Sequence, residues 1–168
     1  MDSDSSHTIE VTVEADAWQT AVTDPELLCR RAVSAVLLGE AATAGAPIEI
    51  GIMLADDARV RILNRDFRGH DRATNVLSFP AGEAATHVAG QPRLLGDVVV
   101  ALETMQREAA SAGIPLSDHL AHLLVHGTLH LLGYDHERED EAERMEAREI
   151  ELLAGLGIAD PYRAEAAP

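Results

Sequence analysis

Alternating and near-continuous apolar positions mark the strands of this chain. From residue 8 to residue 14 every second side chain is apolar, which is the period of a half-buried strand. Residues 94–102 contain the run Val98-Val99-Val100, which is typical of a strand buried on both faces. Pro80 ends another short apolar segment, because proline lacks the backbone donor that a strand ladder needs. The pattern predicts four strands, at residues 8–14, 48–54, 75–79 and 94–102.

Apolar residues spaced three or four positions apart predict helices between and after these strands. The first helix has either Thr23 as its cap or Asp24 as its cap with Pro25 in the first turn. Asp56 or Asp57 caps the next helix. The five predicted helices begin near residues 24, 56, 103, 117 and 140.

The segments between these elements are expected to lack regular structure. They are a disordered tail at residues 1–7, a loop around Trp18, a polar loop at 68–74 and a mobile loop or irregular hairpin at 81–92. No internal repeat or linker interrupts the pattern, so residues 1–168 are predicted to form a single domain. The predicted fold is α+β, a small mixed β-sheet of about four strands packed with about five helices that lie on one side of it.

Charge and composition argue against several classes of protein. The 168 residues carry a net charge of −16, and all 13 basic residues are arginine. This charge argues against a general binder of nucleic acid or of anionic membranes. No apolar run reaches the roughly 18 residues of a membrane span, and the acidic N-terminus is unlike a secretory signal. The single Cys29 is consistent with a reducing cytoplasm and is expected to pack as a small apolar side chain.

Three histidines at ligand spacing predict a metal site. His126 and His130 are four residues apart, so their imidazoles lie one turn apart on the same face of a helix. Gly133 can adopt the left-handed conformation that ends a helix, after which the chain can bring His136 back to the same ion. Three protein nitrogens and an open fourth position are typical of catalytic zinc. We therefore predict one zinc ion per chain, bound by His126, His130 and His136.

The spacing of this motif resembles that of the metzincin metalloproteases, with one difference. Those proteases carry a glutamate as general base directly after the first histidine, where this chain has Gly127. The sequence therefore predicts that the metal is kept while the base for peptide hydrolysis is missing, and that Gly127 leaves room for a bulky substrate. His119 and His122 continue the same helical face upstream and are interpreted as substrate-facing residues or as residues behind the ligands. His122 and His126 are an alternative ligand pair.

A locally basic stretch precedes the third predicted strand. It holds five of the thirteen arginines, at positions 59, 61, 65, 68 and 72. Most of them are interpreted as a solvated helix face. Arg68 is expected to leave the helix into a loop, where its guanidinium beside a metal could bind a phosphate through two donors. Capping the helix or pairing with Asp66 or Asp71 is the alternative role for Arg68.

Four sequence motifs together resemble the YbeY family of endoribonucleases, the ribosomal RNA maturation factors. The motifs are His126-Gly-Thr-Leu-His-Leu-Leu-Gly-Tyr-Asp-His136, Asn64-Arg-Asp-Phe-Arg-Gly69, Thr74-Asn-Val-Leu-Ser-Phe-Pro80 and Leu95-Gly-Asp-Val98. The order and spacing are kept from about residue 48 to Tyr162, including Asp160-Pro161-Tyr162. Before residue 45 only the expected strand and helix match. His70 and Arg72 stand where the family often has lysine, and Ala73 where it often has proline.

The resemblance implies a metal-dependent endoribonuclease that acts on single-stranded RNA. It implies a role in maturing the 3′ end of small-subunit ribosomal RNA and in ribosome quality control, in the cytoplasm. The implied partners are ribosomal RNA or the small ribosomal subunit, with ribosomal or GTPase assembly proteins. Position by position, the three histidines match the zinc ligands of the family, and Arg68 matches its important arginine.

The residues and the resemblance together give a predicted site. Arg68 and His126 are predicted to be catalytic, and Arg59, Arg72, His122 and Asp135 to contact substrate. The general base stays open between Asp135 and the neighbouring histidines, and attack by a 2′-hydroxyl stays as open as attack by water. Two rival functions are a zinc peptidase with a distant base and a ribosome-assembly factor whose zinc is structural.

Overall fold

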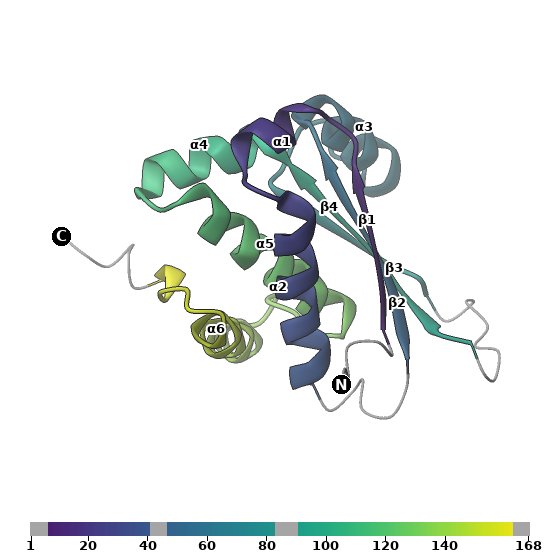
Figure 1. Cartoon of the computed structure of the whole chain (residues 1–168). Helices are drawn as coiled ribbons and strands as arrows, with labels where there is room; N and C mark the ends of the chain where they lie inside the picture. The colour runs from purple at the N-terminus through teal and green to yellow at the C-terminus, as the bar shows by residue number, and fades with distance from the viewer. Residues whose placement is uncertain (1–6, 41–46, 83–90, 163–168) are drawn as a thin grey trace.

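A four-stranded mixed sheet forms the centre of the molecule (Figure 1). The computed structural model describes residues 7–40, 47–82 and 91–162. The strand order is β1-β2-β4-β3; β1, β2 and β4 are parallel to one another, and β3 pairs antiparallel with β4 at one edge. The strands are β1 Thr8–Val13, β2 Ile48–Ala55, β3 Val76–Pro80 and β4 Arg93–Ala101. The α+β fold with four strands is thus confirmed.

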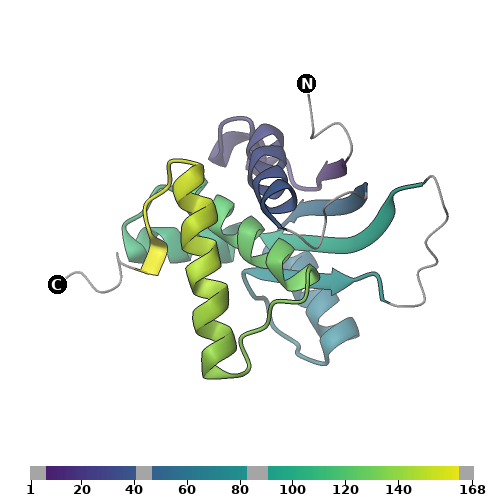
Figure 2. The ribbon, with the colours of Figure 1, turned by 90° about the horizontal axis from the view of Figure 1, so that it is seen from below.

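In the described part of the chain six helices surround this sheet, one more than the sequence predicted. They are α1 Ala17–Ala21, α2 Pro25–Gly39, α3 Asp57–Arg68, α4 Leu102–Ala112, α5 Leu116–Leu131 and α6 Glu139–Gly155. Figure 2 shows α6 running past α5 and α2, and apolar residues of all three helices share one core. Within the described residues, none of the helices is both long and apolar enough to cross a membrane.

Helices cover both faces of the sheet, so the expectation of helices on one side is wrong. Side chains alternate along β4: Val98 and Val100 lie in the large core with α2 and α5, whereas Val99 packs in a smaller cluster with Val60 of α3. Figure 1 shows α3 on the opposite side from α2 and α5. The sequence hides this arrangement because a near-continuous apolar strand says that both faces are covered, and not by which helix.

The structure shows which residue caps each of the two helices for which the sequence left alternatives. Asp24 precedes α2 and its carboxylate accepts a hydrogen bond from the Leu27 N–H at 3.2 Å, with Pro25 as the first helical residue. Asp56 caps α3 in the same way, because its carboxylate accepts from the Arg59 N–H at 2.8 Å. In both cases the aspartate satisfies a backbone donor that the first turn of a helix leaves free.

The helix α1 is the element that the sequence missed, since a loop was expected around Trp18. The Trp18 side chain is fully buried, and its indole N–H donates to the carbonyl of Ala55 at 2.9 Å. This short turn is therefore fixed by a tertiary contact and not by its own periodicity. Cys29 packs in the same core as predicted, and burial raises the pKa of its thiol to about 12.

Two predicted irregular segments fall mostly outside the described residues. Of the tail predicted at residues 1–7, only His7 is described, and its Nδ1 accepts a hydrogen bond from the Ile48 N–H at 3.0 Å. Of the loop predicted at 81–92, the residues 83–90 lie outside the described part. The strand predicted at 75–79 is β3, which begins at Val76 and includes Pro80.

Candidate metal centre

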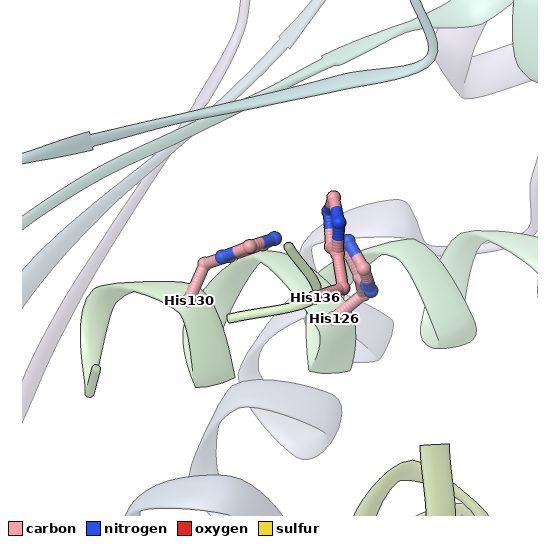
Figure 3. Close-up of side chains that lie close together, drawn as sticks. All are labelled: His126, His130 and His136. Carbon is pink, nitrogen blue, oxygen red and sulfur yellow. The ribbon is translucent and has the colours of Figure 1, made fainter. Parts of the chain in front are cut away.

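The three predicted ligands converge on one point (Figure 3). His126 and His130 lie one turn apart on α5, and His136 comes from the segment that follows this helix. One ring nitrogen of each lies within 4.8 Å of the others. Neutral imidazole nitrogens are good ligands for zinc and for several other transition metals. The donor set therefore fits one metal ion with three protein ligands.

Gly133 makes this convergence possible. It has a φ of 103°, a conformation that side chains disfavour. The Tyr134 N–H donates to the Leu129 carbonyl at 3.1 Å, and the Gly133 N–H donates to the His130 carbonyl at 3.0 Å. These two bonds form a Schellman motif, which ends α5 and turns the chain back on itself. The predicted role of Gly133 as the helix-ending glycine is confirmed.

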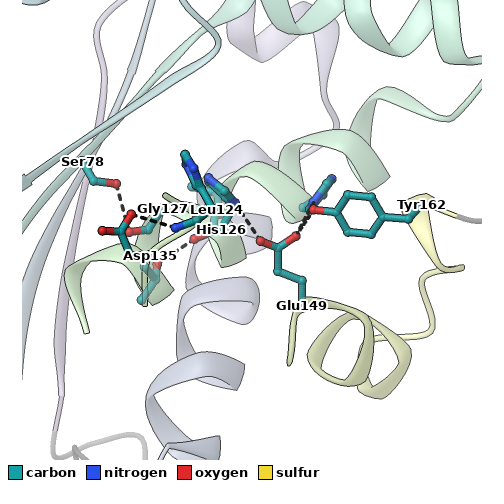
Figure 4. A network of polar contacts seen from close by, with 10 residues as sticks. Ser78, Leu124, His126, Gly127, Asp135, Glu149 and Tyr162 are labelled. Carbon is teal, nitrogen blue, oxygen red and sulfur yellow. Dashed lines mark hydrogen bonds and ion pairs between the residues drawn. The ribbon is translucent and has the colours of Figure 1, made fainter. Parts of the chain in front are cut away.

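A buried carboxylate holds the first ligand from behind (Figure 4). Glu149 of α6 is fully buried, and its Oε2 accepts a hydrogen bond from His126 Nδ1 at 2.7 Å. Its Oε1 accepts from His122 Nε2 at 2.8 Å and from the hydroxyl of Tyr162. Because an ionised carboxylate only accepts, the proton of His126 sits on Nδ1, and Nε2 keeps its lone pair for a metal.

The environment sets the charge of this network. Burial alone would raise the pKa of the Glu149 carboxyl, but hydrogen bonds from His122, His126 and Tyr162 outweigh burial and lower that pKa to about 2. Burial, followed by the charges of His126 and His136, lowers the pKa of His130. Both shifts favour the forms that metal binding requires, a charged carboxylate at Glu149 and a neutral imidazole at His130.

Gly127 serves packing, which corrects the expectation that it leaves room for substrate. It is buried, and a Cβ added there would lie 2.8 Å from Cγ1 of Val98 and 3.2 Å from Oγ of Ser78. The Ser78 hydroxyl also donates to the Gly127 carbonyl at 3.0 Å. The missing side chain therefore lets α5 approach β3 and β4 closely, and it opens no space beside the ligands.

Arg68 lies in the same groove as the histidines. A cavity of about 670 Å³ is lined by Arg68, by all three predicted ligands and by Asp135. Arg68 is the last residue of α3, so the expectation that it leaves the helix into a loop is wrong by one residue. Its guanidinium donates to the Ser78 carbonyl and lies 5.4 Å from the centre of the Phe79 ring. These contacts bring Arg68 to the edge strand β3 beside the metal site.

Neighbouring arginines, and not Arg68, pair with Asp66 and Asp71. Asp66 pairs with Arg65 at 2.9 Å, and Asp71 pairs with Arg61 at 2.8 Å. All four of these side chains are at least half exposed. The predicted solvated arginine face is therefore present, and Arg68 differs from it by facing the groove.

The structure does not bring the other two predicted arginines to the groove. Arg59 lies nine residues before Arg68 on α3, roughly 13 Å along the helix axis, and pairs with Glu14 at 3.3 Å. Arg72 is exposed, and neither arginine lines the cavity that holds the histidines. Asp135 does line it and accepts from the His136 N–H at 2.7 Å.

His119 and His122 lie behind and beside the metal ligands. His122 is bound to Glu149, so it shares an acceptor with His126 and does not form a ligand pair with it. His119 Nε2 lies 2.8 Å from Oε1 of Glu108 on α4. Both histidines line a second cavity that adjoins the first.

Sequence reasoning missed Glu149, the residue that organises the site. Its signal was present, because Glu149 lies four residues after Met145 and four before Leu153, on the apolar stripe of α6. An acidic residue on a buried stripe needs a partner, and an acid opposite a histidine-rich helix has one available. Ser78 and Glu108 carried no comparable signal.

The chain matches a known protein family over most of its length. The sequence model of the family described as Endoribonuclease YbeY matches residues 11–157. The chain belongs to the YbeY family. It is 50% identical over 153 residues to an Endoribonuclease YbeY of Rhodopseudomonas palustris, covering 91% of this chain and 80% of that one. It is 52% identical over 159 residues to one of Paramagnetospirillum magneticum, covering 92% and 96%.

A solved structure shows the same fold. A Thermotoga maritima protein with a solution structure matches with a TM-score of 0.53 and 24% identity, over 88% of this chain and 90% of that one. Membership of the YbeY family confirms the resemblance drawn from the motifs.

Proposed function

We propose that this protein is a zinc-dependent endoribonuclease that cuts single-stranded RNA. The observation that carries the proposal is that three converging imidazoles and Arg68 line the same groove. The relatives that share about half of its sequence are named endoribonucleases. The biological substrate we propose is the 3′ end of small-subunit ribosomal RNA, and the biological role is ribosome maturation and quality control.

Each side chain of the groove has a different role in the proposed reaction. Zinc held by His126, His130 and His136 would supply a Lewis acid and a bound water of lowered pKa. Arg68 keeps donors beyond the one given to Ser78, and these bind the phosphate and stabilise the charge that builds on it. Asp135 lies beside His136 at the groove, where its carboxylate can take a proton from the attacking oxygen.

Partners follow from the charge of the chain. A net charge of −16 opposes binding to RNA in general, so the approach of a phosphate depends on local positive charge such as that of Arg68 at the end of α3. We propose that the RNA is presented on the small ribosomal subunit, with ribosomal or GTPase assembly proteins as further partners, in the cytoplasm.

Metal content and RNA cleavage test this proposal. Protein purified without a metal-affinity tag should hold about one zinc per chain by mass spectrometry, and His130→Ala should lose it. Arg68→Ala should keep the zinc and lose cleavage of single-stranded RNA by roughly 10²- to 10³-fold. Arg65→Ala is the matched control, because Arg65 lies on the same helix and pairs with Asp66 in solvent.

The outcomes separate the rival functions. Cleavage that is unchanged in Arg68→Ala would remove Arg68 from the mechanism. Zinc that is present while RNA stays intact would favour an assembly factor with a structural metal. Cleavage of casein with RNA left intact would favour a peptidase.

A further inference from the structure

A second cavity adjoins the metal groove along α5. It has a volume of about 830 Å³ and shares Asn75, Val76 and His126 with the groove as lining residues. Its floor follows α5 from His126 back to His119, seven residues or roughly 10 Å along the helix axis. A strand of RNA with its phosphate at the metal would therefore place a neighbouring nucleotide in this cavity.

A fixed carboxylate forms one edge of the cavity. Asn75 Nδ2 donates to both oxygens of Glu108, at 3.1 and 3.2 Å, and His119 Nε2 donates to Oε1 at 2.8 Å. An ionised carboxylate has about four acceptor sites, and these bonds fill two on Oε1 and one on Oε2. The side chain of Glu108 is 40% exposed, so Oε2 keeps one acceptor site for a ligand. Asn75 and His119 thus fix the direction in which Glu108 can accept.

The remaining walls suit a flat, uncharged ring. Val76, Ile114 and Leu123 supply apolar surface. At one end the rings of His122 and Tyr162 lie edge to face, with centres 5.4 Å apart. Arg107 also lines the cavity, but its guanidinium pairs with Asp57 at 3.1 Å. Glu108 repels a phosphate, whereas a heterocycle with an amino group would bury its faces on the walls and donate to Oε2.

We propose that this cavity binds the base of the nucleotide next to the scissile phosphate, with Glu108 accepting from an exocyclic amino group. The inference rests on the proposed endoribonuclease function and adds a base preference to it. Cytosine offers an N4 amino donor, the group that acidic side chains recognise, whereas uracil places an acceptor oxygen at the same position. The site therefore favours cytosine over uracil.

Nucleotides without an internucleotide bond test the pocket apart from catalysis. Cytidine 3′,5′-bisphosphate and uridine 3′,5′-bisphosphate are titrated into the zinc-loaded protein, and the side-chain amide resonance of Asn75 is followed by NMR. The wild type should bind the cytidine compound about tenfold more tightly, as expected for one hydrogen bond to a charged acceptor. Glu108→Gln should bring the ratio close to one.

A matched variant is the control for the Glu108→Gln substitution. Glu146→Gln makes the same chemical change at an exposed position of α6, outside both cavities, and should keep the tenfold ratio. Equal affinities of the wild type for the two nucleotides overturn the pocket, as does a ratio that Glu108→Gln leaves unchanged. The wild-type ratio needs no variant, so the test stands if a variant fails to fold.

Cleavage assays distinguish this inference from the proposed function. A base ratio that depends on Glu108, in protein that never cuts RNA, would support the pocket and overturn the nuclease. Cleavage that depends on Arg68, with equal nucleotide affinities, would support the nuclease and overturn the pocket.

Discussion

The helices α3 and α6 are both rich in charge, yet they use it in opposite ways. On α3, Arg61 pairs with Asp71 at 2.8 Å while the two side chains are 60% and 54% exposed. On α6, Glu149 bonds to His126 at 2.7 Å and is fully buried. The distances are alike, and the surroundings are not.

The difference shows which contacts shape the site. An exposed ion pair gains little over its separate contacts with water, so pairs such as Arg61–Asp71 add little to the stability of the fold. A buried carboxylate has no water to return to, so it holds its donors in one arrangement. Glu149 therefore sets the tautomer of His126, whereas among the arginines on α3 only Arg68, at the helix end, reaches the groove.

The largest effect we expect in this comparison comes from Glu149→Gln. An amide presents an N–H group to one of the two histidines, so it cannot accept from both of them. Loss of this support typically costs 10- to 100-fold in metal affinity. The affinity is measured by competition between the protein and a zinc chelator of known strength.

Glu146→Gln is the control for that measurement, since Glu146 lies one turn earlier on α6 and is exposed. Its zinc affinity should equal that of the wild type. An equal affinity in Glu149→Gln would show that the histidines bind metal without help from the carboxylate.

A smaller effect is expected on the acid stability of the metal-free protein. The pKa of Glu149 is about 2 when folded, against 4.5 for an unperturbed glutamate, so the unfolded chain binds more protons between these values. The unfolding free energy should therefore fall as the pH drops from about 4.5 to about 2. The loss is on the order of 3 kcal/mol for a shift of this size.

Chemical unfolding of chelated protein at several pH values measures this slope. Glu149→Gln should flatten it, whatever its stability at neutral pH. Arg61 lowers the pKa of Asp71, but both side chains are more than half exposed and water screens their interaction, so Asp71→Asn should leave the slope nearly unchanged. Equal slopes in the two variants would remove the distinction between the two helices.

The sequence predicts the helices and strands of this fold better than it predicts which of them pack against one another. Among the described residues, periodicity located the four strands and five of the six helices, because it records which positions are buried. The expectation that all helices lie on one side of the sheet was wrong for α3, and α1 was missed, since both depend on tertiary contacts such as the buried indole of Trp18. Those contacts have no local period.

The residues of the candidate site also differ in how well the sequence predicts them. The three histidines and Gly133 were predictable because one helical turn and one glycine turn fix their relative positions. Glu149 was marked only as an acid on the apolar stripe of α6; its histidine partners and the role of Gly127 were not predictable, because they depend on which helix or strand packs against α5. The space that a side chain at position 127 would need is occupied by Val98 of β4, and no local pattern in the sequence connects these two residues.

The smallest effect is expected for the exposed ion pair on α3. Arg61→Ala removes two hydrogen bonds to Asp71, at 2.8 and 3.2 Å. Because both partners are exposed, water replaces these bonds, and the midpoint of thermal unfolding should move by no more than about 2 °C. Zinc affinity should stay unchanged. A drop of many degrees would mean that exposure does not decide the strength of these pairs, and that the surface of α3 holds the fold as firmly as the buried carboxylate of α6.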